Sequence, residues 1–202
     1  MSELRFDNRV AIVTGAGGGL GRAHALLLAK RGAKVVVNDL GGSIDGSASG
    51  GSSPADKVVA EIKAAGGEAV ASYDGVDTWE GAQKIVAKAK EAFGKLDIVI
   101  NNAEVHRGFG ISARRGIDVA KSEMDINYFG LLRLAQEFGP ALRGRSADGE
   151  AGATAWVNLL SIYALANYPP HGTFSASKAA ANSLSQCLRA EMRPAGIRVI
   201  NV

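Results

Sequence analysis

Thr14-Gly15-Ala16-Gly17-Gly18-Gly19-Leu20-Gly21 is the stretch that decides the fold. Before it, the apolar run Val10-Ala11-Ile12-Val13 closes a segment that is short enough to be a buried strand. After it, residues 22–31 carry leucines and alanines at helical spacing and end before Gly32. A glycine-rich turn between a strand and a helix lets the backbone approach a pyrophosphate, for which the helix N-terminus supplies N–H groups and partial positive charge. The stretch therefore predicts nucleotide binding, and the alternative is a flexible glycine-rich loop.

The same alternation of apolar runs and helical segments continues through the chain. It predicts an α/β fold, a Rossmann-type doubly wound parallel sheet with helices on both faces and right-handed crossovers. With 202 residues, a single domain covering 1–202 is expected. Ligands of such sheets bind beyond the carboxyl ends of the strands. Further strands are expected at 33–38, 68–73, 96–100, 154–160 and 197–202, and further helices at 54–65, 78–93, 117–142 and 174–192.

An acidic residue follows the second expected strand. Asp39 lies 18 residues after Gly21, close to the spacing at which a dinucleotide site places the carboxylate that binds the adenosine ribose. A carboxylate accepts hydrogen bonds from two hydroxyls but repels a 2′-phosphate, and no arginine follows immediately to receive one. Asp39 therefore favours NAD over NADP as cofactor, unless it is an ordinary turn aspartate.

Composition excludes several other classes of protein. Hydrophobic residues make up 47% of the chain, yet no unbroken apolar run is long enough to cross a bilayer, so no membrane partner is expected. The net charge is only +3, and no basic stripe with interleaved aromatic residues indicates a nucleic-acid partner. The three histidines and the single cysteine show no metal-ligand spacing, so no metal is expected.

The expected location and loops follow from simpler features. Residues 1–5 show no signal peptide, and the single cysteine, Cys187, excludes an internal disulfide, so a reducing, cytoplasmic location is expected. Cys187 lies within an apolar helical segment, which favours a packed thiol over a nucleophile. The Gly- and Ser-rich segment 41–53 is expected to be a mobile surface loop.

The glycine-rich turn, together with Asn101-Asn102-Ala103, Ser161 and a lysine four residues after position 174, resembles a short-chain dehydrogenase/reductase of the compact subclass. The similarity covers nearly the whole chain. The N-terminal half, including 38–42 and 55–59, is similar to the (3R)-hydroxyacyl-CoA dehydrogenase domain of peroxisomal multifunctional enzymes and its bacterial relatives. The second half, with 123–130, is more similar to other bacterial members of the family.

The resemblance implies a set of catalytic residues. Hydride would pass between the nicotinamide and a carbinol or carbonyl carbon, while a tyrosine at position 174 would exchange a proton with the substrate oxygen. Ser161 would hydrogen-bond that oxygen as charge develops on it. Lys178 would bind the nicotinamide ribose and lower the pKa of the phenol. Asn127 would hold a water that links Lys178 to solvent.

The resemblance also implies a cofactor site. Asn101 would shape the cofactor pocket, and Asp74 would face the adenine ring. Taken one at a time, Ser161 and Asp74 are also typical turn residues, and Lys178 and Asn127 are also typical solvated helix residues. The complete set of expected NAD-binding residues is Gly15, Gly19, Leu20, Gly21, Asp39, Asp74, Asn101, Ala103 and Lys178.

Three features depart from the family pattern. Phe174 occupies the tyrosine position and has no proton to give, although general acid–base catalysis typically contributes about 10²–10⁴-fold. Glu104 replaces the glycine of the family's Asn-Asn-Ala-Gly, where it would crowd the cofactor or repel its pyrophosphate unless it faces outward. The chain ends at Val202, where relatives continue with a substrate lid and a final strand, so a C-terminally truncated domain with an unprotected sheet edge is expected.

Two functions are therefore expected to compete. The first is an NAD(H)-dependent oxidoreductase that interconverts a secondary alcohol and a ketone, with activity impaired by Phe174. Tyr163, Tyr168 or His171 could replace the phenol, but pocket-wall or loop positions are favoured for all three. The second is a non-catalytic dinucleotide-binding or scaffold protein of the same fold. A truncated or chimeric chain with little function is a third, weaker alternative.

The expected partners are a small-molecule alcohol, ketone or acyl thioester and a second copy of the chain. The family pairs its long helices, here beginning near Ile117 and Phe174, across two-fold axes. A homodimer or homotetramer is expected because the apolar side chains on these helices would otherwise stay exposed. These side chains are Phe129, Leu131, Leu132, Leu184 and Leu188.

Overall fold

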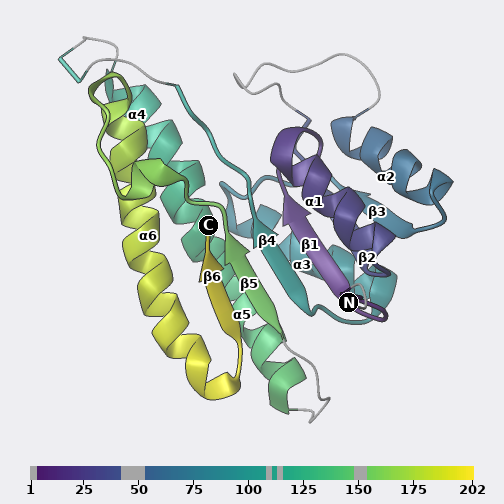
Figure 1. Ribbon diagram of the computed structural model, residues 1–202. Coiled ribbons are helices and arrows are strands. Elements are labelled where there is room, and N and C mark those ends of the chain that lie inside the picture. Colours follow the sequence, from purple (N-terminus) through teal and green to yellow (C-terminus); the bar gives the residue numbers. More distant parts are fainter. Residues whose placement is uncertain (1–3, 42–52, 108–110, 113–115, 148–153) are drawn as a thin grey trace.

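A single parallel sheet with the strand order β3-β2-β1-β4-β5-β6 forms the centre of the computed structural model, which describes residues 4–41, 53–107, 111–112, 116–147 and 154–202 (Figure 1). Every strand pairing is parallel. The expected fold class and the expected strands are confirmed, with ends that differ by a few residues. The strands are β1 (Val10–Thr14), β2 (Lys34–Asn38), β3 (Glu68–Ser72), β4 (Ile98–Asn101), β5 (Ala155–Asn158) and β6 (Arg198–Asn201).

Strand order reverses next to β1. The chain moves from β1 outward to β2 and β3 and then returns to β4, which pairs with the other side of β1. Open α/β sheets bind ligands at such a reversal, beyond the carboxyl ends of the strands. There the Thr14 hydroxyl accepts hydrogen bonds from the backbone N–H groups of Asn102 and Ala103, each at 3.0 Å. These bonds join the glycine-rich turn after β1 to the segment after β4.

The helices lie close to the expected segments, and their ends have local causes. The Ser53 side chain caps the helix that begins at Pro54, and the Thr78 side chain accepts from the Gly81 N–H to cap the next helix. Gly94 ends that helix in the left-handed conformation that glycine adopts without strain. The α-helices are α1 (Gly19–Lys30), α2 (Pro54–Ala64), α3 (Trp79–Phe93), α4 (Gly116–Met124), α5 (Leu131–Ala147) and α6 (Gly172–Met192).

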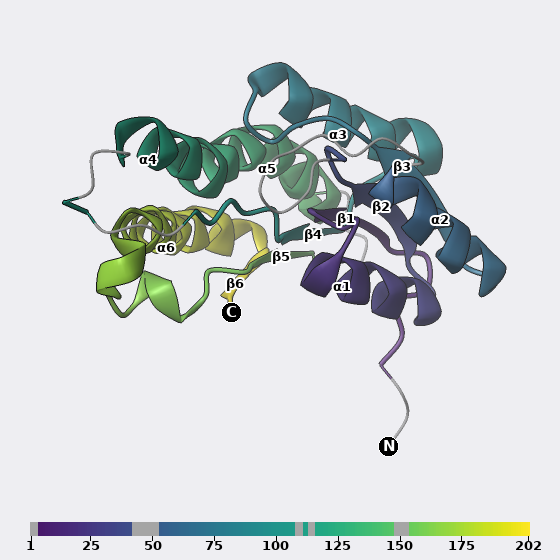
Figure 2. The same cartoon turned by 90° about the horizontal axis from the view of Figure 1, so that it is seen from above.

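Hydrophobic cores cover both faces of the sheet. Alternate residues of β1 belong to different cores, Val10 and Ile12 to one and Ala11 and Val13 to the other, because neighbouring side chains of a strand point to opposite faces. The first core contains residues of α3, α5 and α6, and the second contains residues of α1 and α2. Figure 2 shows α1 on the opposite side of the sheet from α3 and α5. The layers are those of a doubly wound fold.

The long helix expected at 117–142 is in fact three segments. Between α4 and α5 lies a π-helical segment, η1 (Asp125–Gly130). Hydrophobic periodicity cannot register the i→i+5 hydrogen bonds of such a segment, which is why the sequence predicted one continuous helix. Asn127 lies inside η1 and is buried. Short 3₁₀ segments, η2 (Ile162–Ala164), η3 (Pro169–His171) and η4 (Arg193–Ala195), were also not expected.

Three further expectations about single residues were wrong. Cys187 is exposed on α6 and is not a packed thiol, because it lies on a side of the helix that the core does not cover. Leu131 and Leu188, expected on an outer apolar face, are buried in the core.

Two further expectations concerned whole segments, a surface loop and the lack of a membrane span. Most of the loop expected at 41–53 lies outside the described residues, at 42–52. Among the helices of the described part of the chain, none has both the length and the apolar character needed to cross a bilayer.

Candidate active site

The glycine-rich turn folds tightly at the start of α1. Gly15 and Gly19 have φ angles of +62° and +51°, which glycine adopts readily. A Cβ on Gly21 would lie 2.2 Å from the Gly15 carbonyl oxygen, so only glycine fits there. The helix begins at Gly19, three residues earlier than expected, and its N-cap Gly18 offers no side-chain hydrogen bond to the first N–H groups. The start of α1, with Leu20 exposed, is therefore suited to an anion.

The carboxylate of Asp39 stands directly beside this turn. One of its oxygens accepts a hydrogen bond from the Gly17 N–H at 2.8 Å, and the other accepts one from the Gly41 N–H at 2.9 Å. A carboxylate oxygen has two lone pairs, so each can accept a further hydrogen bond from a ribose hydroxyl. The structure thus brings the expected acidic residue and the glycine-rich turn together, as a dinucleotide site requires.

Two other expected cofactor residues lie along the carboxyl edge of the sheet. Asp74 follows β3, and its carboxylate accepts from the Ser72 hydroxyl at 3.3 Å, while its backbone carbonyl accepts from the Asn38 amide at 2.9 Å. Asn101 ends β4 and donates to the Asn158 side chain at 3.3 Å. The neighbouring strand thus holds the Asp74 backbone in one case and the Asn101 side chain in the other, at the edge where a ligand would lie.

Ser161 occupies a strained position after β5. Its φ and ψ angles are +71° and +160°, a region that is essentially restricted to glycine and that costs other residues about 1–3 kcal/mol. Its N–H donates to the Val202 carbonyl, and its side chain is exposed. Such strain is concentrated at functional sites, where surrounding structure holds a side chain in an unfavourable place. The backbone of Ser161 is thus consistent with the expected role.

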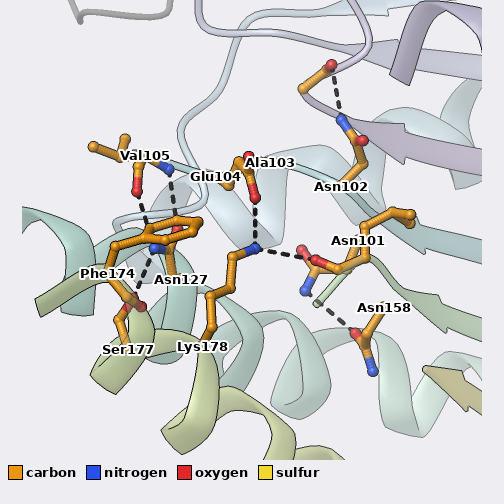
Figure 3. Close-up of polar contacts among 12 residues, drawn as sticks. Asn101, Asn102, Ala103, Glu104, Val105, Asn127, Asn158, Phe174, Ser177 and Lys178 are labelled. Atoms are coloured by element: carbon orange, nitrogen blue, oxygen red, sulfur yellow. Dashed lines mark hydrogen bonds and ion pairs between the residues drawn. The ribbon is translucent and has the colours of Figure 1, made fainter. Parts of the chain in front are cut away.

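Lys178 is buried on α6, with 3% of its side chain exposed, and points toward the segment after β4 (Figure 3). Its ammonium donates to the Leu159 carbonyl at 3.1 Å and lies 5.5 Å from the centre of the Phe174 ring. The Glu104 carboxylate lies 2.6 Å from the same ammonium, so Glu104 does not simply face outward. The cation that would bind the nicotinamide ribose is therefore already paired with a carboxylate of the protein.

Asn127 joins η1 to the segment after β4 and to α6. Its side chain accepts from the Val105 N–H and donates to the Val105 carbonyl, both at 3.0 Å, and donates to Ser177 at 2.9 Å (Figure 3). Among the described residues its hydrogen bonds are to these two partners and not to Lys178. The side chain that was expected to hold a water thus also fixes the backbone beside Glu104.

Glu123 was missed in the sequence. It is fully buried on α4, where its carboxylate accepts from the Arg107 N–H at 2.9 Å and from the Thr173 hydroxyl at 2.6 Å. It therefore ties the segment after β4 to the start of α6. A signal was present, because Glu123 and Asn127 are four residues apart in a helical segment and share its face.

The pairing of His106 with His171 was also missed. Their ring nitrogens Nε2 and Nδ1 lie 2.9 Å apart, although the residues come from the segment after β4 and from η3. Burial, followed by the nearby charge of His171, lowers the pKa of His106 below its ordinary value of 6.5, while Glu104 and Glu123 act in the opposite direction. The residues that flank each histidine do not indicate this contact, because it depends on how the chain folds.

Comparison with known proteins agrees with the geometry. Residues 9–202 match the family described as short chain dehydrogenase. The chain is 59% identical over 183 residues to the peroxisomal multifunctional enzyme type 2 of Mus musculus, a match that covers 82% of this chain and 24% of that protein. The chain therefore belongs to the short-chain dehydrogenase family, and it spans about a quarter of the length of the mouse relative.

Solved structures of the same family have closely similar folds. A short chain dehydrogenase from Mycobacterium avium superposes with a TM-score of 0.87 at 40% identity, covering 96% of this chain and 66% of that one. The carveol dehydrogenase from Mycobacterium avium in complex with NAD superposes with a TM-score of 0.86 at 26% identity, covering 98% of this chain and 70% of that one. The sheet and helices described above are thus those of family members with solved structures.

Proposed function

We propose that this chain is the catalytic domain of an NAD(H)-dependent oxidoreductase that interconverts a secondary alcohol and a ketone. The observation that carries the proposal is the buried Lys178 ammonium, held by the Leu159 carbonyl at the carboxyl edge of a dinucleotide-type sheet. Burying an ammonium is costly unless it is paired and hydrogen-bonded, and here the Glu104 carboxylate and the Leu159 carbonyl supply both contacts. The family and its NAD-bound neighbour support a nicotinamide dinucleotide as a further ligand of this ammonium, in competition with Glu104.

The adenosine half of NAD fits the residues that are present. The start of α1 leaves N–H groups for the pyrophosphate, and a Cβ on Gly18 or Gly19 would meet no atom within 4 Å, so open space surrounds this end of the helix. Asp39 accepts one N–H bond on each oxygen and can accept ribose hydroxyls as well. Its negative charge favours NAD over NADP by repelling a 2′-phosphate.

The reaction would use three side chains of the protein. When bound, the nicotinamide ring supplies the hydride acceptor or donor. Ser161 is proposed to hydrogen-bond the substrate oxygen, because its strained backbone presents an exposed hydroxyl at the end of β5. Lys178 is proposed to hold the nicotinamide ribose. Asn127 fixes the Val105 backbone and so positions the wall of the site.

The proposed substrate is a 3-hydroxyacyl thioester or its ketone. The support is the resemblance of the N-terminal half to (3R)-hydroxyacyl-CoA dehydrogenase domains and the 59% identity to a peroxisomal multifunctional enzyme. That relative is named as a peroxisomal enzyme, which does not support the cytoplasmic location expected from the sequence. That location stays a prediction, because nothing in the structure tests it.

A second copy of the chain is the proposed partner. A groove of about 330 Å³, lined mainly but not only by apolar side chains, lies between α5 and α6. The partly buried Leu132 and Leu184 line this groove together with the exposed Cys187. Phe129, three residues before Leu132 in the sequence, is 40% exposed. Covering this groove would remove apolar surface from water. The proposed assembly is a homodimer or homotetramer.

A non-catalytic role is favoured by two specific observations. Phe174 stands where a proton donor would be expected. The Glu104 carboxylate already forms an ion pair with the Lys178 ammonium, which also lies over the Phe174 ring. A protein that binds the dinucleotide without turning over substrate would tolerate both features. It would bind NADH but would show no hydride transfer with any alcohol.

One experiment separates the two functions. Isothermal titration with NADH and NADPH measures cofactor binding, and the absorbance of NADH then reports turnover with a panel of secondary alcohols and 3-hydroxyacyl-CoA thioesters. The proposed function predicts tighter binding of NADH and measurable turnover of at least one hydroxyacyl thioester. Binding without turnover across the panel, also in a Phe174→Tyr variant, would support the non-catalytic role.

A further inference from the structure

An aromatic cluster surrounds the position where the family keeps its tyrosine. The His106 ring stacks on Phe174 with centroids 3.9 Å apart and an interplanar angle of 20°. Tyr163 lies against Phe174 at 5.2 Å and against His171 at 5.4 Å. Phe174 is 2% exposed, whereas both histidines are partly exposed. The ring that stacks on the buried Phe174 is therefore a partly exposed imidazole.

The two imidazoles form a chain with one end free. Their 2.9 Å contact joins His106 Nε2 to His171 Nδ1. Such a contact is a hydrogen bond when one nitrogen donates and the other accepts. Within the described residues, the contact of Nε2 with His171 is the one hydrogen bond of the His106 ring, which leaves Nδ1 without one. When His106 carries its hydrogen on Nε2, its Nδ1 has a free lone pair.

We propose that His106 exchanges the proton of the substrate hydroxyl in place of the missing phenol, and that His171 relays this proton to solvent. The inference rests on the proposed oxidoreductase function. It assigns a catalytic role to His106, since its free ring nitrogen would contact the substrate oxygen. His171 acts through His106 and is a positioning and relay residue.

The step balances as an alcohol oxidation. The carbinol carbon loses its C–H pair as hydride to the oxidised nicotinamide dinucleotide, and the C–O bond becomes a carbonyl. The hydroxyl proton goes to Nδ1 of His106. The hydrogen on Nε2 then passes to Nδ1 of His171, and the hydrogen on Nε2 of His171 is released to water. Each imidazole ends neutral, in its other tautomer, and a later exchange with solvent restores the starting state.

The charges that face His106 determine the pH at which it can act as a base. They are His171 on η3, Glu104 beside the strand end, Glu123 on α4 and Lys178 on α6; Tyr163 on η2 packs against the ring. Burial and the charge of His171 dominate and hold the pKa of His106 below 6.5. The neutral, proton-accepting form is therefore present at neutral pH. Oxidation should rise as pH increases through this lowered pKa and should be level above it.

The test compares matched variants of the full chain. His106→Phe keeps a ring that can stack on Phe174 but removes the base, and His171→Asn keeps a hydrogen-bonding group near the Nδ1 position but removes the relay. With NAD and a 3-hydroxyacyl-CoA, kcat of His106→Phe should fall by about 10²-fold or more, while the Kd for NADH should stay unchanged. An unchanged kcat in His106→Phe would overturn the inference.

A second readout does not depend on turnover. Imidazole signals in a ¹H–¹⁵N NMR titration should show His106 titrating below 6.5. His171→Asn removes a neighbouring charge that lowers the pKa of His106, so the pKa should rise. If it does not move, the proposed coupling of the pair is wrong.

The outcomes also separate this inference from the proposed function. If the unmodified protein is inactive and Phe174→Tyr is active, the oxidoreductase function stands and the histidine inference fails. If both bind NADH and neither turns over substrate, the proposed function itself fails. In the Phe174→Tyr variant the phenol would titrate at higher pH than His106, so the pH profile of an active variant identifies which group takes the proton.

Discussion

Glu104→Gln should make the protein bind NADH more tightly. In the structure the Glu104 carboxylate lies 2.6 Å from the Lys178 ammonium, which also donates to the Leu159 carbonyl at 3.1 Å. The nicotinamide ribose is proposed to bind the same ammonium, so it must compete with the carboxylate. Glutamine keeps the size of the side chain but removes the charge, and it therefore removes most of this competition.

The size of the effect follows from the exposure of the pair. A hydrogen bond to a charged group contributes about 1.5–3 kcal/mol. The Glu104 side chain is 45% exposed, and solvent screens exposed ion pairs, so the lower end applies. About 1.5 kcal/mol corresponds to a Kd for NADH about tenfold lower in the variant. Isothermal titration calorimetry measures this change directly.

Glu80→Gln is the matched control. The Glu80–Lys84 pair on α3 has the same 2.6 Å separation but is exposed on both sides, with 75% and 56% of the side chains accessible. This variant should leave the Kd for NADH unchanged. Glu104→Gln should also lower the thermal midpoint of the free protein, because Lys178 then stays buried without a carboxylate, and NADH should restore it. Equal or weaker NADH binding by Glu104→Gln would refute the proposed competition.

Three further predictions concern other parts of the molecule. Asp39→Arg should narrow or reverse the preference for NADH over NADPH, and tighter NADPH binding by the unmodified protein in the same calorimetric titration would contradict the assignment. Ser161→Gly should raise the free energy of unfolding by about 1 kcal/mol by relieving the backbone strain at φ +71°, measured by urea denaturation, while turnover falls. Leu184→Glu, in the groove between α5 and α6, should shift the protein toward monomers by light scattering, and a monomeric unmodified protein would reject the proposed assembly.

Much of the fold could be predicted from the sequence because its signals are local. Buried parallel strands give short apolar runs, and Gly15 and Gly21 of the turn have steric requirements that only glycine meets. The π-helical η1 could not be predicted, because one widened turn leaves no mark on a hydrophobic pattern. The exposure of Cys187 could not be predicted either, because it depends on which side of α6 the core covers.

The roles of the candidate site residues stay predictions, and the structure gives their positions and contacts. Ser161 follows β5, and Phe174 and Lys178 lie on α6, where Lys178 donates to the Leu159 carbonyl. The contact of Glu104 with Lys178 and that of His106 with His171 join residues far apart in the chain. Such contacts depend on loop paths and side-chain rotamers, which spacing alone does not determine. These are also the contacts that decide whether the site can act without a tyrosine.

Isotope transfer tests the central claim, that this site moves hydride between an alcohol carbon and a nicotinamide, most directly. A 3-hydroxyacyl-CoA deuterated at C3 would be incubated with NAD and the unmodified protein, and the reduced dinucleotide would be examined by mass spectrometry. Our account predicts NADH that carries one deuterium, with the label lost when Lys178 is changed to Met. A protein that binds NAD by calorimetry but yields no deuterated NADH, alone or as Phe174→Tyr, would contradict it.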